Sequence, residues 1–208
     1  NVSMEPLHAF LLKKREPFIL KNSPALNWPL IQKMSWIYIQ ENLPRQINVN
    51  INREKFDLYS NGERKNMRTM SLNETLKIFN ALDQIKSLSL YRDAGNLSFP
   101  YFMTKLKHNT RFKMEMLNDI LDTPFHELSL CGDKAGDSTN CVTDTNLWLG
   151  ARHVHAVAHY DATHNSYVQI LGSKEFILAP PDSAKYLYFY PLIHPKHHRQ
   201  SKIINLED

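Results

Sequence analysis

The stretch "HYDATHNSYVQILGSKEFILAPPD", residues 159–182, decides how this chain is interpreted. It places a histidine and an aspartate two positions apart and follows them with two short apolar runs separated by Gly-Ser. A Gly-X pair between such runs is typical of a two-residue type II′ turn, which predicts a hairpin of 165–171 with 174–178. The region around it is therefore expected to be built from antiparallel strands.

The predicted hairpin places several polar residues on one surface. With the turn at the Gly-Ser pair, Asn165 shares a face with Lys174, because side chains alternate between the two faces of a strand. If the chain stays extended back to His159, then His159 and Asp161 lie on that same face. The strand geometry thus predicts one surface that carries an imidazole, a carboxylate, an amide and an ammonium group.

The spacing of His159 and Asp161 suits a shared metal ion. Their Cα atoms are about 7 Å apart in an extended chain, and side chains of that length can meet at one ion with bonds of about 2.1 Å. His155 is about 13 Å from His159 along a strand, and His164 has the opposite parity. One neutral imidazole and one carboxylate suit ferrous iron or manganese, and a second histidine would complete a facial triad.

The motif alone leaves a simpler interpretation open. An isolated H-x-D is also typical of a solvated or hydrogen-bonded strand end, and Lys174 alone is equally consistent with a surface lysine.

The chain has 208 residues, 42% of them apolar, which suits one domain over 1–208 with a hydrophobic core. No run of about 18 apolar residues predicts a membrane span.

Charge and chain ends set further expectations. The net charge is +4, and the basic run "KKR" at 13–15 is too short to indicate nucleic acid. The chain begins at Asn1 and stops soon after a basic loop, so we expect it to be a fragment.

The two cysteines, Cys131 and Cys141, are expected to be free thiols in a reducing compartment. A disulfide between them in a secretory compartment is the alternative. Three N-x-S/T sequons, at Asn1, Asn73 and Asn96, keep that second option open.

Local patterns predict the elements of the first half. "EPFILKN" at 16–22 indicates a short buried strand. "SWIYIQENLP" indicates a helix with Ser35 as its N-cap and Pro44 just past its end. The alternating "INVNIN" at 47–52 indicates a half-buried strand, and 56–59 is a candidate partner for it.

Two amphipathic helices are expected next. Ser71 and Glu74 form a capping box, followed by an apolar helical face of Leu72, Leu76, Phe79 and Leu82. Residues 111–121 form another amphipathic segment, in which Met114 and Met116 are expected in the core. From about residue 145 the pattern changes to short β-rich runs. Helices in 1–140 followed by strands in 141–208 predict an α+β fold.

The longer string "HYDATHNSYVQILGSKEFILAPPDSAKYLYFYPLIHPKHHRQS", residues 159–201, resembles a known family. The order H-Y-D, N, Q-I-x-G-x-K, I-L-x-P-P-D, L-Y-x-Y-P, H-P and R-Q-S resembles the JmjC/cupin-type iron(II)- and 2-oxoglutarate-dependent oxygenases. More narrowly, it is similar to the asparaginyl hydroxylase type represented by factor inhibiting HIF. The resemblance is strong over 147–202. It implies a double-stranded β-helix, or jelly roll, with N-terminal helices, of which the chain holds the first part.

The resemblance also implies roles for single residues. His159 and Asp161 would be two iron ligands. Lys174 would bind the distal carboxylate of 2-oxoglutarate, with Asn165 near the iron and Tyr101 donating a hydroxyl to the same carboxylate. Arg199 and Gln200 would contact a protein or peptide substrate.

The resemblance further implies a setting for the whole protein. No nucleic-acid or membrane partner is expected, and a homodimer of the full-length protein stays open. The cytoplasm or nucleus is the expected location. The sequence departs from the family pattern in two ways. Ala156 replaces the family's Thr or Ser three residues before the metal histidine, and the second histidine ligand would lie beyond Asp208.

Other functions stay open at this point. His194, His197 and His198 could substitute for the missing ligand, but "HPKHHR" is more typical of an exposed basic turn. A non-catalytic cupin-like binding module, or a degenerate oxygenase without the second histidine, is the alternative to a protein hydroxylase. A JmjC demethylase or an RNA-modifying relative would share the metal chemistry.

Overall fold

The computed structural model describes residues 16–52, 67–84, 99–106, 111–125, 144–152, 154, 156–195 and 197–203. The chain divides into two compact units. Unit 1 contains Asn1–Asn42, Lys105–Thr145 and Asp161–Leu178, and unit 2 contains Leu43–Thr104, Asn146–Tyr160 and Ala179–Asp208. The two units alternate along the chain, and the single domain expected over 1–208 stays a prediction. Among the described residues, no helix is long and apolar enough to cross a membrane.

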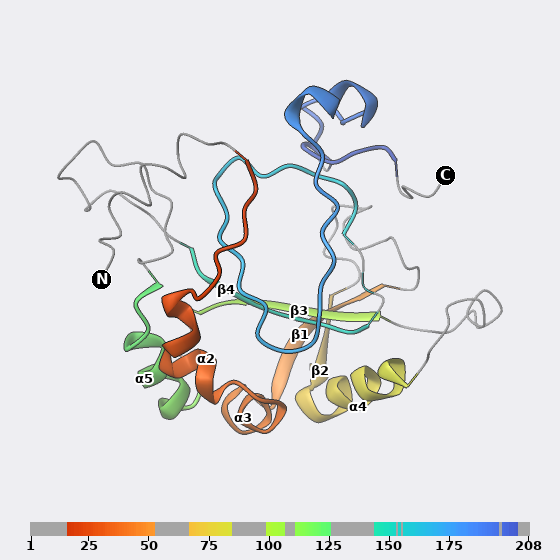
Figure 1. The fold of residues 1–208 in the computed structure, drawn as a ribbon. Coiled ribbons are helices and arrows are strands. Elements are labelled where there is room, and N and C mark those ends of the chain that lie inside the picture. Colours follow the sequence, from red (N-terminus) through yellow and green to blue (C-terminus); the bar gives the residue numbers. More distant parts are fainter. Residues whose placement is uncertain are drawn as a thin grey trace. The chain divides into compact units, whose positions relative to one another are not determined.

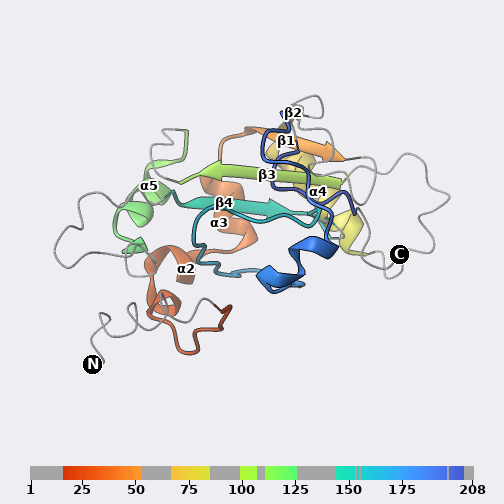
Figure 2. The same cartoon turned by 90° about the horizontal axis from the view of Figure 1, so that it is seen from above.

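Unit 2 is built on a four-stranded sheet with the order β2-β1-β3-β4 (Figures 1 and 2). Its strands are β1 (Gln46–Asn52), β2 (Met67–Ser71), β3 (Phe99–Lys105) and β4 (Asn146–Gly150). β1 runs antiparallel to both β2 and β3, with Gln46 opposite Ser71 and Asn50 opposite Tyr101. β3 lies inside the sheet, and Phe99, Pro100, Tyr101 and Phe102 are all buried. Together with the helices, this antiparallel sheet makes the architecture α+β, as predicted. The predicted order is wrong, because β1, β2 and β3 precede residue 141 and only β4 of this sheet follows it.

The strand at β1 and the helix after β2 form for the reasons that their sequences indicate. In β1, Ile47 and Val49 are buried whereas Gln46 and Asn48 are exposed, which is the predicted alternation. Helix α4 (Leu72–Asp83) starts directly after β2, and the Ser71 hydroxyl accepts a hydrogen bond from the Glu74 N–H at 3.1 Å. This cap is the predicted one.

The apolar face of α4 is also as predicted. Leu72, Phe79 and Leu82 are buried, and Leu76 is half-buried. The Leu72 N–H donates to the Arg45 carbonyl at 2.8 Å, which ties the start of α4 to the start of β1. The last helix of unit 2 is the 3₁₀ helix η6 (Pro181–Tyr186), which begins at the second proline of "APPD".

Unit 1 contains the helices on the N-terminal side and one later helix. They are η1 (Pro24–Asn27), α2 (Pro29–Lys33), α3 (Trp36–Asn42) and α5 (Met114–Leu121). The Ser35 hydroxyl accepts from the Tyr38 N–H at 3.1 Å, and Pro44 follows the end of α3, so the predicted helix is confirmed. α2 and α3 both pack against α5, and Trp28 meets Phe125 edge to face with ring centroids 5.6 Å apart.

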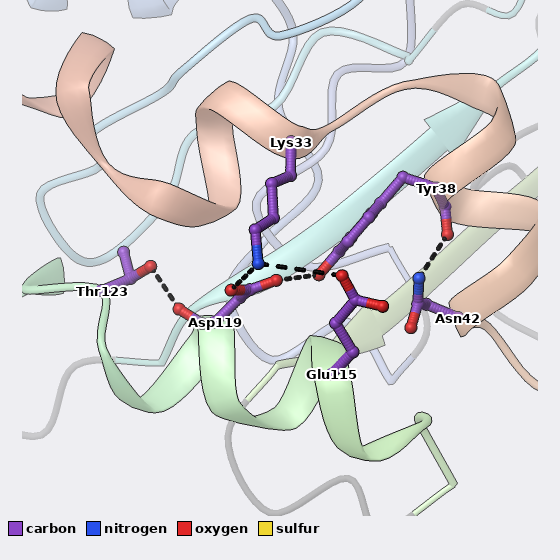
Figure 3. A network of polar contacts seen from close by, with 6 residues as sticks. All are labelled: Lys33, Tyr38, Asn42, Glu115, Asp119 and Thr123. Carbon is purple, nitrogen blue, oxygen red and sulfur yellow. Dashed lines mark hydrogen bonds and ion pairs between the residues drawn. The ribbon is translucent and has the colours of Figure 1, made fainter.

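A network of polar side chains fastens α2 and α3 to α5 (Figure 3). The Lys33 ammonium donates to one Asp119 oxygen at 2.7 Å, and the Tyr38 hydroxyl donates to the other at 2.5 Å. Asp119 is 5% exposed. Glu115 adds a longer ion pair with Lys33, 3.8 Å between Nζ and Oε1. We call Lys33, Tyr38 and Asp119 the helix clasp.

The clasp shifts the pKa of each of its members. Burial alone would raise the pKa of the Asp119 carboxyl, but hydrogen bonds from Lys33 and Tyr38 and the Lys33 charge hold it below its usual value. The hydrogen bond to Asp119 raises the pKa of Lys33. Burial, followed by the bond to Asp119, raises the pKa of Tyr38. Asp119 and Lys33 are therefore both charged at neutral pH.

Two local predictions are wrong. Residues 16–22 form no strand, and 16–19 are exposed, because this short apolar run gains no strand partner. Met114 is 69% exposed, whereas Met116 is completely buried. Met114 is the first residue of α5, and two positions along a helix turn a side chain toward the other side, so only Met116 reaches the core.

The hairpin prediction is only partly right. Residues 161–178 contain no strand, so 165–171 and 174–178 are not the paired strands that the Gly-Ser turn predicts. Gly172 does adopt a positive φ of 71°, the conformation expected at the first turn position. The predicted partner at 56–59 and both cysteines, Cys131 and Cys141, lie outside the described residues.

Candidate metal centre

His159 is positioned by its own backbone neighbourhood in unit 2. Its Nδ1 lies 2.7 Å from the Val157 carbonyl oxygen. A carbonyl can only accept, so a neutral ring carries its proton on Nδ1 and has its lone pair on Nε2. This is the arrangement that metal-binding histidines use, because the second nitrogen fixes the tautomer and the orientation of the ring.

The segment around His159 pairs with the segment around Gln200. His159 faces Gln200 in an antiparallel bridge. On either side of the bridge, the Tyr160 N–H donates to the Arg199 carbonyl at 3.1 Å and the Ser201 N–H donates to the Ala158 carbonyl at 2.7 Å. The predicted metal position and the predicted substrate position therefore share one backbone register.

Asp161 and Asn165 are brought together in unit 1. The Asn165 amide donates to Asp161 Oδ2 at 2.5 Å. This contact fixes one carboxylate oxygen and gives Asn165 a position next to the predicted ligand. The backbone bends at Ala162 and Thr163, between the two residues.

The Lys174 ammonium lies beside a pair of aromatic rings. Its Nζ is 5.1 Å from the ring centroid of Tyr167 and 5.1 Å from that of Phe176. The two rings meet edge to face at 4.9 Å. Tyr167, Lys174 and Phe176 belong to the set that the turn places on one face, so the predicted parity holds here without strands. Burial lowers the pKa of the Lys174 ammonium.

Tyr101 is buried in the sheet of unit 2. Its ring packs against Trp148 of β4 with centroids 5.2 Å apart. A Cβ atom at Gly150 would lie 3.4 Å from Tyr101 Cδ2, so the glycine lets β4 approach this ring closely. Tyr101 is thus held rigidly at a defined point of β3.

Arg199 and Gln200 end a turn whose backbone is strained. Arg199 has a φ of 70°, a left-handed conformation that costs a non-glycine residue on the order of 1 kcal/mol. The Gln200 side-chain oxygen lies 3.0 Å from His197 Nδ1. Asn22 and Tyr188 also have positive φ values, so the role of Arg199 in substrate binding stays a prediction.

His194 and His197 contact each other. His194 Nδ1 accepts from the His197 N–H at 2.9 Å, and the two rings lie 5.1 Å apart. Residues 197–199 form a turn, and His198 is exposed, as the motif "HPKHHR" indicates. Within the residues that the structure describes, no group of three or more His, Cys, Asp or Glu side chains is arranged to hold a metal ion.

The predicted site residues fall into small groups. His159, Tyr101, Arg199 and Gln200 belong to unit 2, whereas Asp161, Asn165 and Lys174 belong to unit 1. The structure joins His159 with Gln200 and Asp161 with Asn165. Their convergence on one metal ion stays a prediction. The donor set, a neutral imidazole with a carboxylate, fits ferrous iron in its chemistry.

Three contributors were not assigned a role from the sequence. Tyr167 and Phe176 contact Lys174, and the available signal was that the turn places all three on one face. The Val157 carbonyl, which orients His159, had no sequence signal, because any residue provides a backbone carbonyl.

Comparison with known proteins places this chain among cupin-like sequences. Residues 5–208 match the cupin-like domain family. The chain is 29% identical over 101 residues to "Lysine-specific demethylase JMJ32" of Arabidopsis thaliana, covering 45% of this chain and 29% of that protein. It is 29% identical over 96 residues to "JmjC domain-containing protein D" of Dictyostelium discoideum, covering 45% and 21%.

A third relative has a different name. The chain is 41% identical over 66 residues to "tRNA wybutosine-synthesizing protein 4" of Neurospora crassa, covering 31% of this chain and 5% of that protein. In all three cases the matched part spans less than a third of the relative's length. The family match confirms the predicted fold class, an α+β fold of the cupin jelly-roll type.

Proposed function

Because this chain belongs to the cupin-like domain family, we propose that it is an iron(II)- and 2-oxoglutarate-dependent oxygenase acting on a protein or peptide side chain. The two relatives with JmjC-type names support the reaction class. The observation that carries the proposal is the orientation of His159, whose Nδ1 is held by the Val157 carbonyl so that Nε2 has the lone pair.

His159 and Asp161 would hold the iron. When bound, iron with 2-oxoglutarate supplies the activation of oxygen that a C–H hydroxylation needs. Asn165 would keep Asp161 oriented, since its amide N–H donates to one of the two carboxylate oxygens. Tyr101 would donate its hydroxyl to the co-substrate carboxylate.

Lys174 would pair with the distal carboxylate of 2-oxoglutarate. The rings of Tyr167 and Phe176 lie against its ammonium group and restrict the motion of its side chain. Partial burial of the ammonium group would make its ion pair stronger than one in open water, although the side chain keeps contact with solvent. This is how a single lysine can select a dicarboxylate.

The finer proposal is an asparaginyl hydroxylase. The motif order from "HYD" to "RQS" supports it, and Arg199 and Gln200 would contact the peptide. We propose a protein partner rather than nucleic acid, a cytoplasmic or nuclear location, and a homodimer of the full-length protein. Hydroxylation adds one oxygen atom to an Asn-containing peptide, whereas demethylation of a methyl-lysine peptide releases formaldehyde. Mass spectrometry on both peptides therefore separates the two reactions.

The experiment that tests the reaction class is an anaerobic titration with iron(II) in the presence of 2-oxoglutarate. The chain should develop the weak visible charge-transfer band of iron chelated by 2-oxoglutarate. His159→Ala should abolish the band, whereas His164→Ala, a matched exposed histidine, should keep it. A wild-type chain without the band, or equal bands in the two variants, would reject the proposal.

A non-catalytic cupin-like binding module is the second candidate, and Ala156 favours it. The methyl group of Ala156 cannot donate the hydrogen bond expected from the family's Thr or Ser. In an oxygenase, Ala156→Thr should strengthen 2-oxoglutarate binding by about fivefold, the gain expected from one added hydrogen bond. In a binding module the substitution changes nothing, and no 2-oxoglutarate is consumed.

A further inference from the structure

We propose that Ser201 is a positioning residue that holds the backbone at His159. The inference rests on the proposed metal function of His159 and names a residue to which that function assigned no role. Ser201 is 3% exposed, which is unusual for a serine that follows a turn. It lies directly after Gln200, the residue that faces His159.

The Ser201 hydroxyl satisfies two backbone groups at once. It donates to the Leu187 carbonyl at 2.5 Å and accepts from the Ile203 N–H at 2.9 Å. The Ser201 backbone N–H donates to the Ala158 carbonyl at 2.7 Å. One small residue thus joins its own segment, 201–203, to the segments around 158 and 187.

This joint reaches His159 through the backbone. The Ala158 carbonyl belongs to the peptide group that leads directly into His159, so its hydrogen bond from Ser201 orients that peptide. Next to it, the Phe189–Ser201 bridge and the Tyr190 N–H, which donates to the Gln200 carbonyl at 2.9 Å, hold the 199–201 segment in register. Loss of the Ser201 hydroxyl would remove its bond to the Leu187 carbonyl. The 199–201 segment, which pairs with residues 158–160, would then move more freely.

Serine is the residue whose chemistry this position requires. Its hydroxyl both donates and accepts, and its size fits a closed site. Alanine would leave the part-buried Leu187 carbonyl and Ile203 N–H without this partner, which costs free energy. Cysteine keeps the size but donates weakly, and so provides a graded variant.

The test uses the 208-residue chain with two readouts. The first is amide hydrogen exchange at Tyr160, whose N–H bonds to Arg199, and at Ser201 itself. The second is paramagnetic broadening of the His159 imidazole signals by Mn(II), which needs no catalysis. Ser201→Ala should speed exchange at position 160 at least tenfold and weaken the Mn(II) effect about tenfold, as outer partners of metal ligands do.

Thr75→Val is the matched control. Thr75 is 1% exposed, and its hydroxyl donates at 3.0 Å to the carbonyl of Ser71, the N-cap of α4. Thr75→Val removes a buried hydroxyl from the same unit and leaves the 158–160 segment unchanged. The substitution should lower thermal stability, as Ser201→Ala does, but should change neither amide exchange at Tyr160 nor Mn(II) broadening of the His159 signals.

The outcomes separate this inference from the proposed function. If Mn(II) broadens no His159 signal in the wild-type chain, the metal function fails, and amide exchange still decides the role of Ser201. If Ser201→Ala and Thr75→Val give the same exchange at Tyr160 and the same Mn(II) response, the inference is wrong. Should Ser201→Ala not fold, Ser201→Cys must show an intermediate loss in both readouts, and wild-type values there would overturn the inference.

Discussion

His159 and Gln200 occupy facing positions of an antiparallel bridge. One is the proposed metal ligand, and the other is proposed to contact the peptide. A backbone shift in the segment around 159 or the segment around 200 would therefore disturb both residues. The metal role of His159 and the peptide role of Gln200 can be tested separately only by substitutions that change a side chain and leave this backbone pairing intact.

Gln200→Ala is such a change. It removes the side chain, including its contact with His197, and keeps the backbone bridge to His159. We expect the KM for a peptide substrate to rise about tenfold, the cost of one lost hydrogen bond to a bound partner, with Mn(II) affinity unchanged. Steady-state kinetics and a metal titration on the same variant check this. A parallel loss of metal affinity would contradict the assignment.

Lys174→Met should impair the use of 2-oxoglutarate. The substitution keeps an apolar chain beside the rings of Tyr167 and Phe176 but removes the charge that would pair with a carboxylate. The KM for 2-oxoglutarate should rise on the order of 100-fold, as expected for a partly desolvated charge pair. Lys185→Met is the matched control, because the Lys185 Nζ also lies over an aromatic ring, 4.9 Å from the centroid of Tyr186. Equal effects of the two substitutions would dismiss the special role of Lys174.

Asp119→Asn should destabilise the chain in a pH-dependent way. The folded-state pKa of Asp119 is lowered, so its contribution is present above the unfolded-state pKa of about 4 and is lost as the pH falls through the folded-state value. At pH 7 the cost should be about 2 kcal/mol. The difference in Tm between wild type and variant should shrink steadily from pH 5 toward pH 2. A difference that stays constant with pH would mean that the Asp119 charge has no role.

The partner of Asp119 provides an independent check. Lys33 is half exposed, so solvent screens its ion pair with Asp119 and the pair should contribute only weakly to stability. Lys33→Met combined with Asp119→Asn in a double-mutant cycle should give a small favourable coupling energy, measured by urea unfolding. Coupling indistinguishable from zero would show that the Tyr38 hydrogen bond alone accounts for the clasp.

Met116→Ala and Met114→Ala should differ strongly, although the two methionines are neighbours on α5. Met116 is fully buried, and its truncation should cost about 3 kcal/mol of unfolding free energy. Met114 is 69% exposed, and its truncation should cost less than about 0.5 kcal/mol. Chemical denaturation of both variants checks this. Similar losses would show that α5 is oriented differently.

Elements with local signals could be predicted from the sequence. The Ser35 cap defined α3, the alternation in 47–52 defined β1, and the Ser71–Glu74 capping box defined α4. Each signal lies within a few residues of the structure that it specifies. The exposed run at 16–19 shows the limit, since its apolar residues favour a strand but no partner strand pairs with it.

Features that depend on distant residues could not be predicted in the same way. The clasp joins Lys33 and Tyr38 to Asp119, and no local pattern in 33–38 indicates an aspartate on α5. The face shared by Tyr167, Lys174 and Phe176 could be predicted from the two-residue alternation. The absence of paired strands over 161–178 could not, because strand pairing depends on the surroundings as well as on the turn.

The clasp has a consequence for the order of folding. Its two bonds to Asp119 span 86 and 81 residues, and contacts across so long a stretch require a large loss of chain entropy before they form. We expect the β1–β2 pairing and the capped α4 to form first and the clasp to form late. Mutations of Asp119 should then speed unfolding and leave the refolding rate nearly unchanged, a φ-value near zero.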